Sequence, residues 1–170
     1  MSNATTPPSV LNPKPAPTAA KLWHINNPSG NTGMLAVDKV GGAALFLDPK
    51  TLAIQHSIAI PGAHEMVISP DHMLGYVAQF GKWGRNAEGT GALLEPAYLI
   101  WVIDLNTHSV IDRIDTHPHM GPHGMKFDLD GNLWVTFESN ALGLIDTQQR
   151  KLVQAWSLGE PAQPPRTLEI

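Results

Sequence analysis

The stretch that decides the fold is His117–Phe137, which reads His-Pro-His-Met-Gly-Pro-His-Gly-Met-Lys-Phe-Asp-Leu-Asp-Gly-Asn-Leu-Trp-Val-Thr-Phe. Met125 and Phe127 alternate with polar residues, and the residues that follow Asn132 are rich in aromatic and β-branched side chains. This alternation indicates a half-buried strand, and Asp-Gly-Asn between two such segments indicates a tight turn. The stretch therefore predicts a β-hairpin.

The first strand of this hairpin occurs twice in the chain, at a constant spacing of 59 residues. The matched pairs are Gly62 with Gly121, His64 with His123, Met66 with Met125, Ile68 with Phe127, and Asp71 with Asp130. An apolar strand, Leu74–Ala78, also follows the earlier copy. An internal repeat outranks local patterns, because each copy is one structural unit of a larger array.

A second repeated unit joins two apolar strands through an aspartate. An apolar run precedes each of these aspartates, and an apolar residue recurs ten positions later: Asp48 and Ile58, Asp104 and Ile114, Asp146 and Trp156. An Asp side chain bonds the backbone amide two residues on, so these aspartates are predicted to form turns rather than to act in catalysis. Together the two units predict four strands in about 40 to 45 residues, the period of a β-propeller blade.

The sequence thus predicts an all-β propeller region over 21–160, with about three four-stranded blades at 34–60, 64–116 and 123–158. Residues 1–20 include five prolines and are expected to form a disordered tail, and 161–170 a second, truncated tail. A fourth blade is expected to begin after Gly159 and to stop. Three blades do not close a ring, so we expect a part of a larger propeller, with six to eight blades, or closure by self-association.

Lys21–Asn26 is a further possible strand before the first predicted blade. If it is an inner strand, His24 lies twelve residues before Ala36, as His64 lies twelve before Tyr76. His24 would then be a third copy of the repeated histidine. The polar and proline residues that follow it do not fit the repeat, so both interpretations stay open.

Composition limits the possible function. A chain of 170 residues with 42% hydrophobic content predicts a single domain. The net charge of −4 and the scattered 11 Lys and Arg residues argue against a nucleic-acid partner, and no run of 18 apolar residues predicts a membrane span. The chain has no cysteine, which excludes disulfides and thiolate metal sites. No signal peptide is recognisable, and the compartment stays open.

The longest irregular stretch is 81–97, a Gly-rich insertion expected to form a long loop between two strands of the second blade. In a meander, this loop lies at the same end as the connections between blades, so it shares one face with the repeated histidines. The candidate ligand-binding residues there are His64, Glu65, His119, His123, Trp83, Arg85, Asn86 and Glu138. His117, Glu88, Glu95, Ser139 and Asn140 lie on the same predicted face.

His64 and His123 begin equivalent inner strands near the propeller axis, where two imidazoles and a carboxylate suit Zn²⁺ or another divalent ion. Alternatively, each histidine only bonds the backbone of a neighbouring blade. His117 and His119 have no local metal-ligand spacing, which favours exposed loop residues over ligands. Three tryptophans at strand positions are expected in the core between blades, whereas Trp83 suits either a core or a ligand stack: the three are Trp101, Trp134 and Trp156.

Several motifs resemble YVTN-repeat β-propellers over residues 34–158. They are Val102-Ile-Asp-Leu-Asn-Thr followed by Val110, the Ser-Pro-Asp sequence at 69–71, the Gly-Tyr-Val-Ala sequence at 75–78, and the Gly-rich insertion itself. The stretch Pro122–Val135 is also similar to blades of gluconolactonase-type and virginiamycin-lyase-type propellers. In the lactonase pattern a metal-binding Asp stands where this chain has His123.

Two functions follow as expectations. The resemblance to YVTN repeats implies a protein that binds a small molecule or a protein through the loop-bearing face, without assigned catalysis. The lactonase and lyase resemblance implies a metal-dependent hydrolase or lyase. No nucleophile elbow, phosphate loop or paired-histidine zinc motif occurs in the sequence, so no residue is assigned a catalytic role. The only cofactor that either function suggests is a divalent metal ion.

Overall fold

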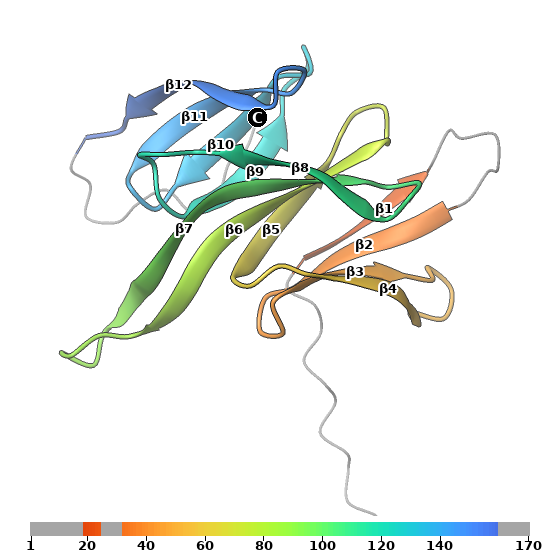
Figure 1. The fold of residues 1–170 in the computed structure, drawn as a ribbon, viewed down its shortest axis with the longest axis horizontal. Coiled ribbons are helices and arrows are strands. Elements are labelled where there is room, and N and C mark those ends of the chain that lie inside the picture. Colours follow the sequence, from red (N-terminus) through yellow and green to blue (C-terminus); the bar gives the residue numbers. More distant parts are fainter. Residues whose placement is uncertain (1–18, 25–31, 160–170) are drawn as a thin grey trace, which may run out of the picture.

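The computed structural model describes residues 19–24 and 32–159, in which every regular element is a β-strand (Figure 1). The strands are β1 (Ala19–His24), β2 (Thr32–Asp38), β3 (Ala43–Leu47), β4 (Ile54–Ala59), β5 (Ala63–Ile68), β6 (Leu74–Arg85), β7 (Gly91–Asp104), β8 (Ser109–Asp115), β9 (Pro122–Phe127), β10 (Leu133–Phe137), β11 (Ala141–Asp146) and β12 (Lys151–Ser157). No helix in the described part of the chain is long and apolar enough to cross a membrane.

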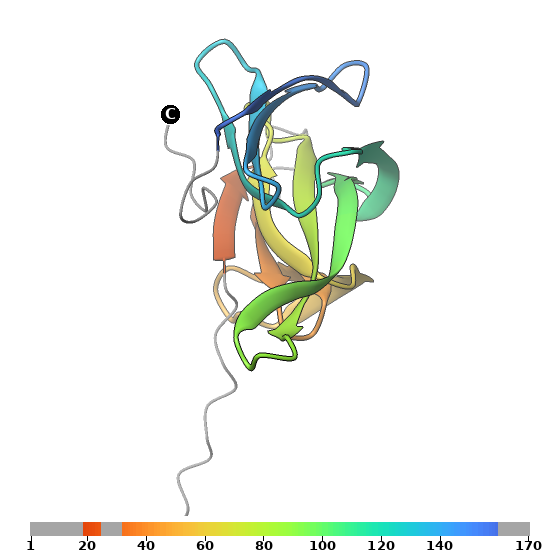
Figure 2. The same cartoon turned by 90° about the vertical axis from the view of Figure 1, so that its left-hand side faces the viewer.

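The strands form three antiparallel four-stranded meanders: blade 1 (β1–β4), blade 2 (β5–β8) and blade 3 (β9–β12). The blades follow one another face to face, as the two cartoon views show (Figures 1 and 2). The first strands, β1, β5 and β9, lie closest to the neighbouring blades, and the last strands lie on the outside. The predicted all-β class and the three four-stranded blades are confirmed.

Blade 1 includes the possible early strand, because β1 covers Ala19–His24. The first two residues of β1, Ala19 and Ala20, lie in the segment expected to be a tail. His24 pairs with Thr32 beside the β1–β2 connection, whereas His64 lies at the other end of its inner strand. His24 is therefore not a third copy of the repeated histidine. The rest of the first tail, the tail at 161–170 and the expected start of a fourth blade lie outside the described residues.

The predicted aspartate turns are confirmed in all three blades. Asp48 Oδ1 accepts hydrogen bonds from the amides of Lys50 (2.9 Å) and Thr51 (2.8 Å), and Asp104 and Asp146 repeat this pattern. Four residues after each Asp, the chain adopts a positive φ at a non-glycine residue: Leu52 (58°), His108 (53°) and Arg150 (53°). The aspartate therefore fixes a turn that ends in a left-handed residue.

Two cores hold the blades together, because each side of blade 2 packs against a neighbour. Phe46 of blade 1 packs with Val77 and Ile103, while Tyr76 and Val102, the adjacent residues on the same strands, pack with blade 3. Adjacent side chains in a strand point to opposite faces, so β6 and β7 supply both cores at once. This central position explains their nearly continuous apolar sequence.

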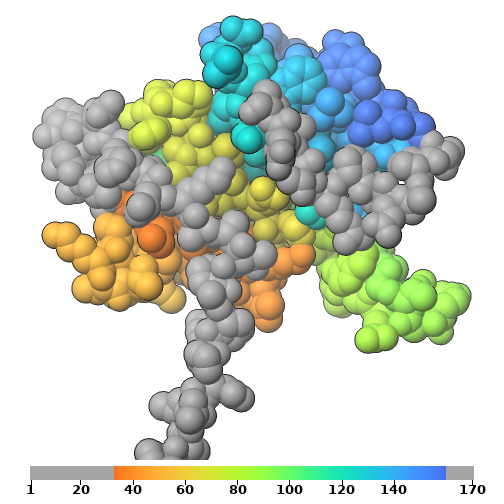
Figure 3. Space-filling model, turned by 180° about the vertical axis from the view of Figure 1, so that it is seen from behind, coloured from red at the N-terminus to blue at the C-terminus, as the bar shows by residue number. Residues whose placement is uncertain are grey.

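The insertion at 81–97 is not the expected loop. β6 and β7 continue through it as a two-stranded ribbon that pairs up to Arg85 and Gly91, and only the turn between them is irregular. Gly81 allows the ribbon to bend: its φ is 113°, and a Cβ there would lie 2.2 Å from the Glu95 carbonyl oxygen. The Gly and Pro content suggested a loop, but here it marks bulges in paired strands. The ribbon projects from the body at the lower right of Figure 3.

The tryptophan prediction holds only in part. Trp101 packs against the core between blades 1 and 2, and Arg113 lies 4.0 Å from its ring. Trp134 and Trp156, in contrast, lie on the face of blade 3 turned away from blade 2, where they stack at 5.6 Å. Trp156 is 37% exposed. They lie outside both cores because no described blade covers that face.

Candidate functional site

The two repeated histidines occupy the same backbone irregularity in blades 2 and 3. In blade 2, the pairing of β5 with β6 shifts between Ala63 and Glu65, which leaves His64 as an extra residue on β5. In blade 3, the pairing of β9 with β10 shifts at the equivalent place, around His123. A β-bulge of this kind redirects a side chain relative to the regular alternation. Both imidazoles therefore point into the space between β5 and β9, toward each other.

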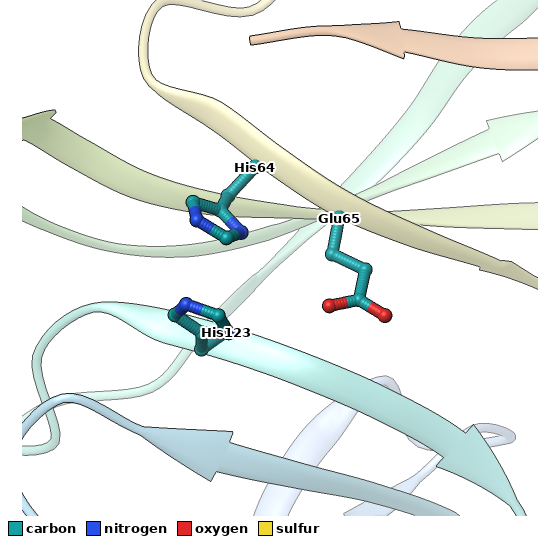
Figure 4. A group of neighbouring side chains, drawn as sticks. All are labelled: His64, Glu65 and His123. Atoms are coloured by element: carbon teal, nitrogen blue, oxygen red, sulfur yellow. The ribbon is translucent and has the colours of Figure 1, made fainter. Parts of the chain in front are cut away.

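The bulges bring the two histidine rings into contact. Their centroids lie 3.9 Å apart with an angle of 47° between the planes, and both side chains are half-buried (Figure 4). Phe80, which is buried, supports the pair from β6: its ring lies 5.0 Å from that of His64 and 5.4 Å from that of His123. The two histidines therefore lie together, as predicted, and His64 is the one of the two that lines the cavity described below.

Glu65 completes a group of three possible metal ligands, which we call the histidine cluster: His64, Glu65 and His123. One ligand atom from each residue lies within 4.8 Å of the other two. In Figure 4 the carboxylate of Glu65 lies beside the gap between the two imidazoles. Two imidazoles and one carboxylate are a ligand set that zinc accepts in sites with an open coordination position.

Lys39, in the connection between β2 and β3, approaches the cluster from blade 1. Its Nζ donates a hydrogen bond to His64 Nε2, and it also lies 5.9 Å from the centre of the Phe80 ring. A charged lysine only donates, so in this contact the acceptor is Nε2 of His64. While this contact holds, the Lys39 ammonium group occupies Nε2 of His64, and that nitrogen does not bind a metal ion.

A cavity of about 710 Å³ opens beside the cluster at the loop-bearing end. It is formed by the β2–β3 connection, the β4–β5 connection and the base of the ribbon, and it is lined by Lys39, Val40, Gly41, Gly42, Pro61, Gly62, Ala63, His64, Gln79, Gly81, Lys82, Trp83, Glu95, Pro96 and Ala97. Backbone hydrogen bonds from Ile60 to Gly42 and from Phe80 to Gly62 fix its walls. The cavity therefore joins blade 1 to the part of the insertion closest to the body.

Trp83 and Glu95 are the predicted insertion residues that reach this cavity. Trp83 is the aromatic one of the two. Its side chain is 44% exposed, and its ring lies 6.1 Å from Phe80. Next to it, Lys82 forms an ion pair of 2.7 Å with Glu95, which raises the pKa of the lysine through that hydrogen bond and charge. Of the two readings of Trp83, ligand stacking fits its exposure better than a core position does.

Other predicted site residues lie at the tip of the ribbon, away from the histidines. Arg85 Nη1 donates to the carbonyl of Gly89 (2.9 Å), and Asn86 Oδ1 accepts from the amide of Thr90 (2.9 Å). Both residues stabilise the turn that ends the ribbon, and Glu88 is exposed within it. The expectation that Arg85, Asn86 and Glu88 join the histidines is wrong, because pairing of β6 with β7 carries them outward.

The remaining candidates lie around blade 3. His117 stacks on Tyr98 at 3.8 Å and contacts Asp115, and His119 lies 5.3 Å from Phe137, so neither joins the cluster. Glu138 lies nearer to the cluster, because Gly121 separates it from Phe80, the ring that supports the two histidines. A Cβ added to Gly121 would lie 2.8 Å from Glu138 Cβ and 3.4 Å from Phe80 Cδ2. Ser139 and Asn140 follow Glu138 in the same connection, at the same end of the blades.

Two residues of the site, Lys39 and Phe80, were not predicted. Phe80 follows Tyr76 and Ala78 at the spacing of one strand face, so extending the predicted strand Leu74–Ala78 by two residues would have included it. Lys39 lies in a turn of blade 1, at the end that the meander brings to the histidines. The repeat did not indicate Lys39, because neither repeated unit includes the β2–β3 turn.

Comparisons with known proteins support the fold and leave the family open. No family model matches the chain, and no curated protein matches it. A solved structure described as hydrazine synthase from Kuenenia stuttgartiensis is similar, with a TM-score of 0.61 and 22% sequence identity over 82% of this chain. The matched region spans 36% of that other chain. At this identity the likeness concerns the fold alone: the protein is an all-β chain with three propeller-type blades in its described residues.

Proposed function

We propose that the protein is a ligand-binding propeller of the YVTN-repeat kind and that it binds a small organic acid in the cavity at its loop-bearing end. The observation that carries the proposal is the meeting of Lys39, His64 and Trp83 in one cavity of about 710 Å³. Cavities of this size suit small molecules, and specificity usually comes from a few polar groups on a largely apolar wall. Propellers host many activities, so the fold itself does not select the ligand.

The chemistry of the wall favours an anionic group on the ligand. The charge of Lys82 is balanced by Glu95 at 2.7 Å. Gln79 is engaged at both ends of its amide, with the Pro61 carbonyl and the Trp101 indole, each at 2.9 Å. Lys39 supplies positive charge at this wall, and the exposed ring of Trp83 offers a flat surface for stacking.

Calorimetric titration of the purified chain with a panel of aliphatic and aromatic carboxylic acids tests this function. The Lys39→Met and Trp83→Ala variants are each expected to lose roughly tenfold or more in affinity for the acids that bind. Lys50→Met is the matched control, because Lys50 lies exposed in the Asp48 turn at the other end of blade 1. Unchanged affinity in the Lys39 variant, or equal loss in the Lys50 variant, would contradict the proposal.

A metal-dependent hydrolase or lyase is the second candidate, and the histidine cluster is the observation that favours it. The ligand atoms lie within 4.8 Å of one another, so modest side-chain rotation would bring them to zinc-ligand distances of about 2.0 to 2.2 Å. Lys39 would have to leave His64 Nε2 to admit the ion. The residues fit a metal with an open position, whose chemistry would be to polarise an ester or lactone carbonyl.

Metal analysis of the purified protein separates the two candidates. One bound zinc or manganese ion per chain, lost in both His123→Ala and Glu65→Gln, is expected if the enzyme hypothesis holds. Lactone hydrolysis that depends on the same residues would complete that case. Protein that neither retains nor takes up a divalent ion would exclude the metal enzyme and would leave the binding function standing.

A further inference from the structure

The contact between blades 2 and 3 provides a template for how one blade packs on the next. Six residues on one face of blade 2 make this contact, and all are at most 6% exposed: Val67, Tyr76, Ala78, Ile100, Val102 and Ile114. They come from all four strands of the blade. Their burial depends on blade 3, since the opposite face of the same strands packs on blade 1.

The strand register identifies the equivalent positions in blade 3. Tyr76 pairs with Val102 and Ile100 with Ile114; in blade 3 the corresponding pairs are Trp134 with Leu144 and Leu142 with Trp156. The six equivalents, which we call the blade 3 outer face, are Lys126, Trp134, Thr136, Leu142, Leu144 and Trp156. This face is mostly apolar and has one charged residue. It therefore has the composition of a blade-to-blade contact with no described blade against it.

Blade 1 also has an apolar face with no described blade against it, on the side turned away from blade 2. Blade 2 packs on blade 1 through residues that include Val77, Trp101, Ile103 and Val110. The equivalent residues of blade 1, which we call the blade 1 outer face, are Ala36, Leu45, Leu47 and Ile54. All four are apolar; Ala36 and Leu47 are buried, Leu45 is half-buried, and Ile54 is 54% exposed. The three described blades thus present, at the two sides of their arc, two faces that match the two sides of their own internal contacts.

We propose that two copies of this chain associate head to tail, with the blade 3 outer face of each copy against the blade 1 outer face of the other. Each face then repeats the contact that blades 2 and 3 already make within the chain. Head-to-tail contacts close into a ring when the rotation between subunits allows it, and two sets of three blades give six, within the usual range of propellers. The association would cover Trp156, Leu144 and Ile54, which otherwise form apolar surface in contact with water.

The mass of the full chain in solution tests the proposal. Light scattering coupled to size exclusion is expected to give twice the chain mass of 18.4 kDa. Trp156→Glu and Ile54→Asp, one on each face, should each shift the mass toward that of a single chain. Leu129→Asp is the matched control, because Leu129 is fully exposed in the β9–β10 turn, away from both faces. Infrared amide absorption of each variant verifies that the strands are retained.

Each other result overturns the proposal in a distinct way. A wild-type monomer would exclude the second copy and would assign the two faces to another chain or to residues of this chain outside the described ones. Dissociation by Trp156→Glu alone, with Ile54→Asp still dimeric, would indicate a symmetric contact between two blade 3 faces. A ladder of increasing masses would show that the head-to-tail contact forms without closing at two copies.

Discussion

Asp128 holds the turn between β9 and β10 through both of its carboxylate oxygens. It accepts hydrogen bonds from the amides of Asp130 and Asn132, from the Asn132 side chain and from the Trp134 indole at 2.8 Å. These bonds, with the indole contributing most, lower the pKa of Asp128 to about 2. The sequence pointed to Asp130 by its match with Asp71, but the carboxylate that binds the turn is two residues earlier.

Because the folded state lowers this pKa, Asp128 stabilises the protein above the ordinary carboxyl value of 3.8, and the contribution is lost as the pH falls toward 2. We expect the melting temperature of the wild type to fall through this window. Asp128→Ala should melt lower at neutral pH and should lose part of the slope between pH 4 and 2, the range set by the two pKa values. Parallel curves for the two proteins would contradict this role.

His108 links two blades through an aromatic contact. Its ring lies 4.1 Å from that of Phe46 and 5.6 Å from that of His56, both in blade 1. Burial, followed by the nearby His56, lowers the pKa of His108 below its ordinary 6.5, although Asp104 opposes the shift. The neutral ring is thus the form that suits the folded protein.

A lowered histidine pKa means that stability is complete above 6.5 and decreases as the pH falls through that value. His108→Asn removes the titration and keeps a residue that tolerates the positive φ of 53°. We expect the variant to show a shallower loss of melting temperature between neutral pH and pH 5, the acid side of that pKa. An unchanged slope would assign the pH dependence to other groups.

At the scale of the element, the ribbon formed by β6 and β7 depends on the bend at Gly81. A Cβ there would meet the Glu95 carbonyl oxygen at 2.2 Å, and φ is 113°. Gly89, in the ribbon turn, has φ 77° and no atom within 4 Å of the added Cβ, so it is a matched control for the backbone conformation alone.

We expect Gly81→Ala to lower the free energy of unfolding by roughly 2 to 4 kcal/mol, from the clash and the conformation together. Gly89→Ala should cost only about 1 kcal/mol, since it changes the conformation alone. Urea unfolding measures both values. Equal losses in the two variants would show that the ribbon base can move aside and that the bend at Gly81 is not fixed.

The histidine cluster shows how much of the site the sequence contained. The spacing of 59 residues was enough to pair His64 with His123 and to place both at the loop-bearing end. Glu65 was included because it follows His64. The bulge that turns the rings toward each other was not visible, because a bulge depends on pairing with β6 and β10 and not on the composition of the inner strand. The same limitation concealed the ribbon, where register and not residue type distinguishes strand from loop.

At the scale of the whole molecule, the blades differ in how much of each strand is covered. Within β6, residues Gly75–Ala78 are all buried between two blades, whereas β4 and β12 are mostly exposed. We expect amide hydrogen exchange to be slowest in this part of β6 and fastest in β4 and β12, because opening requires less apolar surface to be exposed at the outer edges. Equal protection in β6 and β12 would indicate that the outer strands are covered in solution.

Repeats were sufficient to predict the overall architecture, because each copy of the aspartate turn and of the inner strand specifies one blade. What the repeats did not indicate is which blade faces have a neighbour. Trp134 and Trp156 have the residue types of core positions and were predicted there, and they align with the buried Tyr76 and Ile114. Their exposure reflects the position of blade 3 in the described arc, not their sequence context.

The stacked indoles of Trp134 and Trp156, 5.6 Å apart with 24° between their planes, have an optical consequence. Two indole chromophores this close couple their electronic transitions, and the coupled pair produces a positive and a negative band in the far-ultraviolet dichroism spectrum. Strands give a weak spectrum, so this exciton couplet should dominate part of it and should vanish in Trp156→Phe. Infrared amide absorption, to which indole contributes little, is therefore the sounder way to measure strand content in this protein.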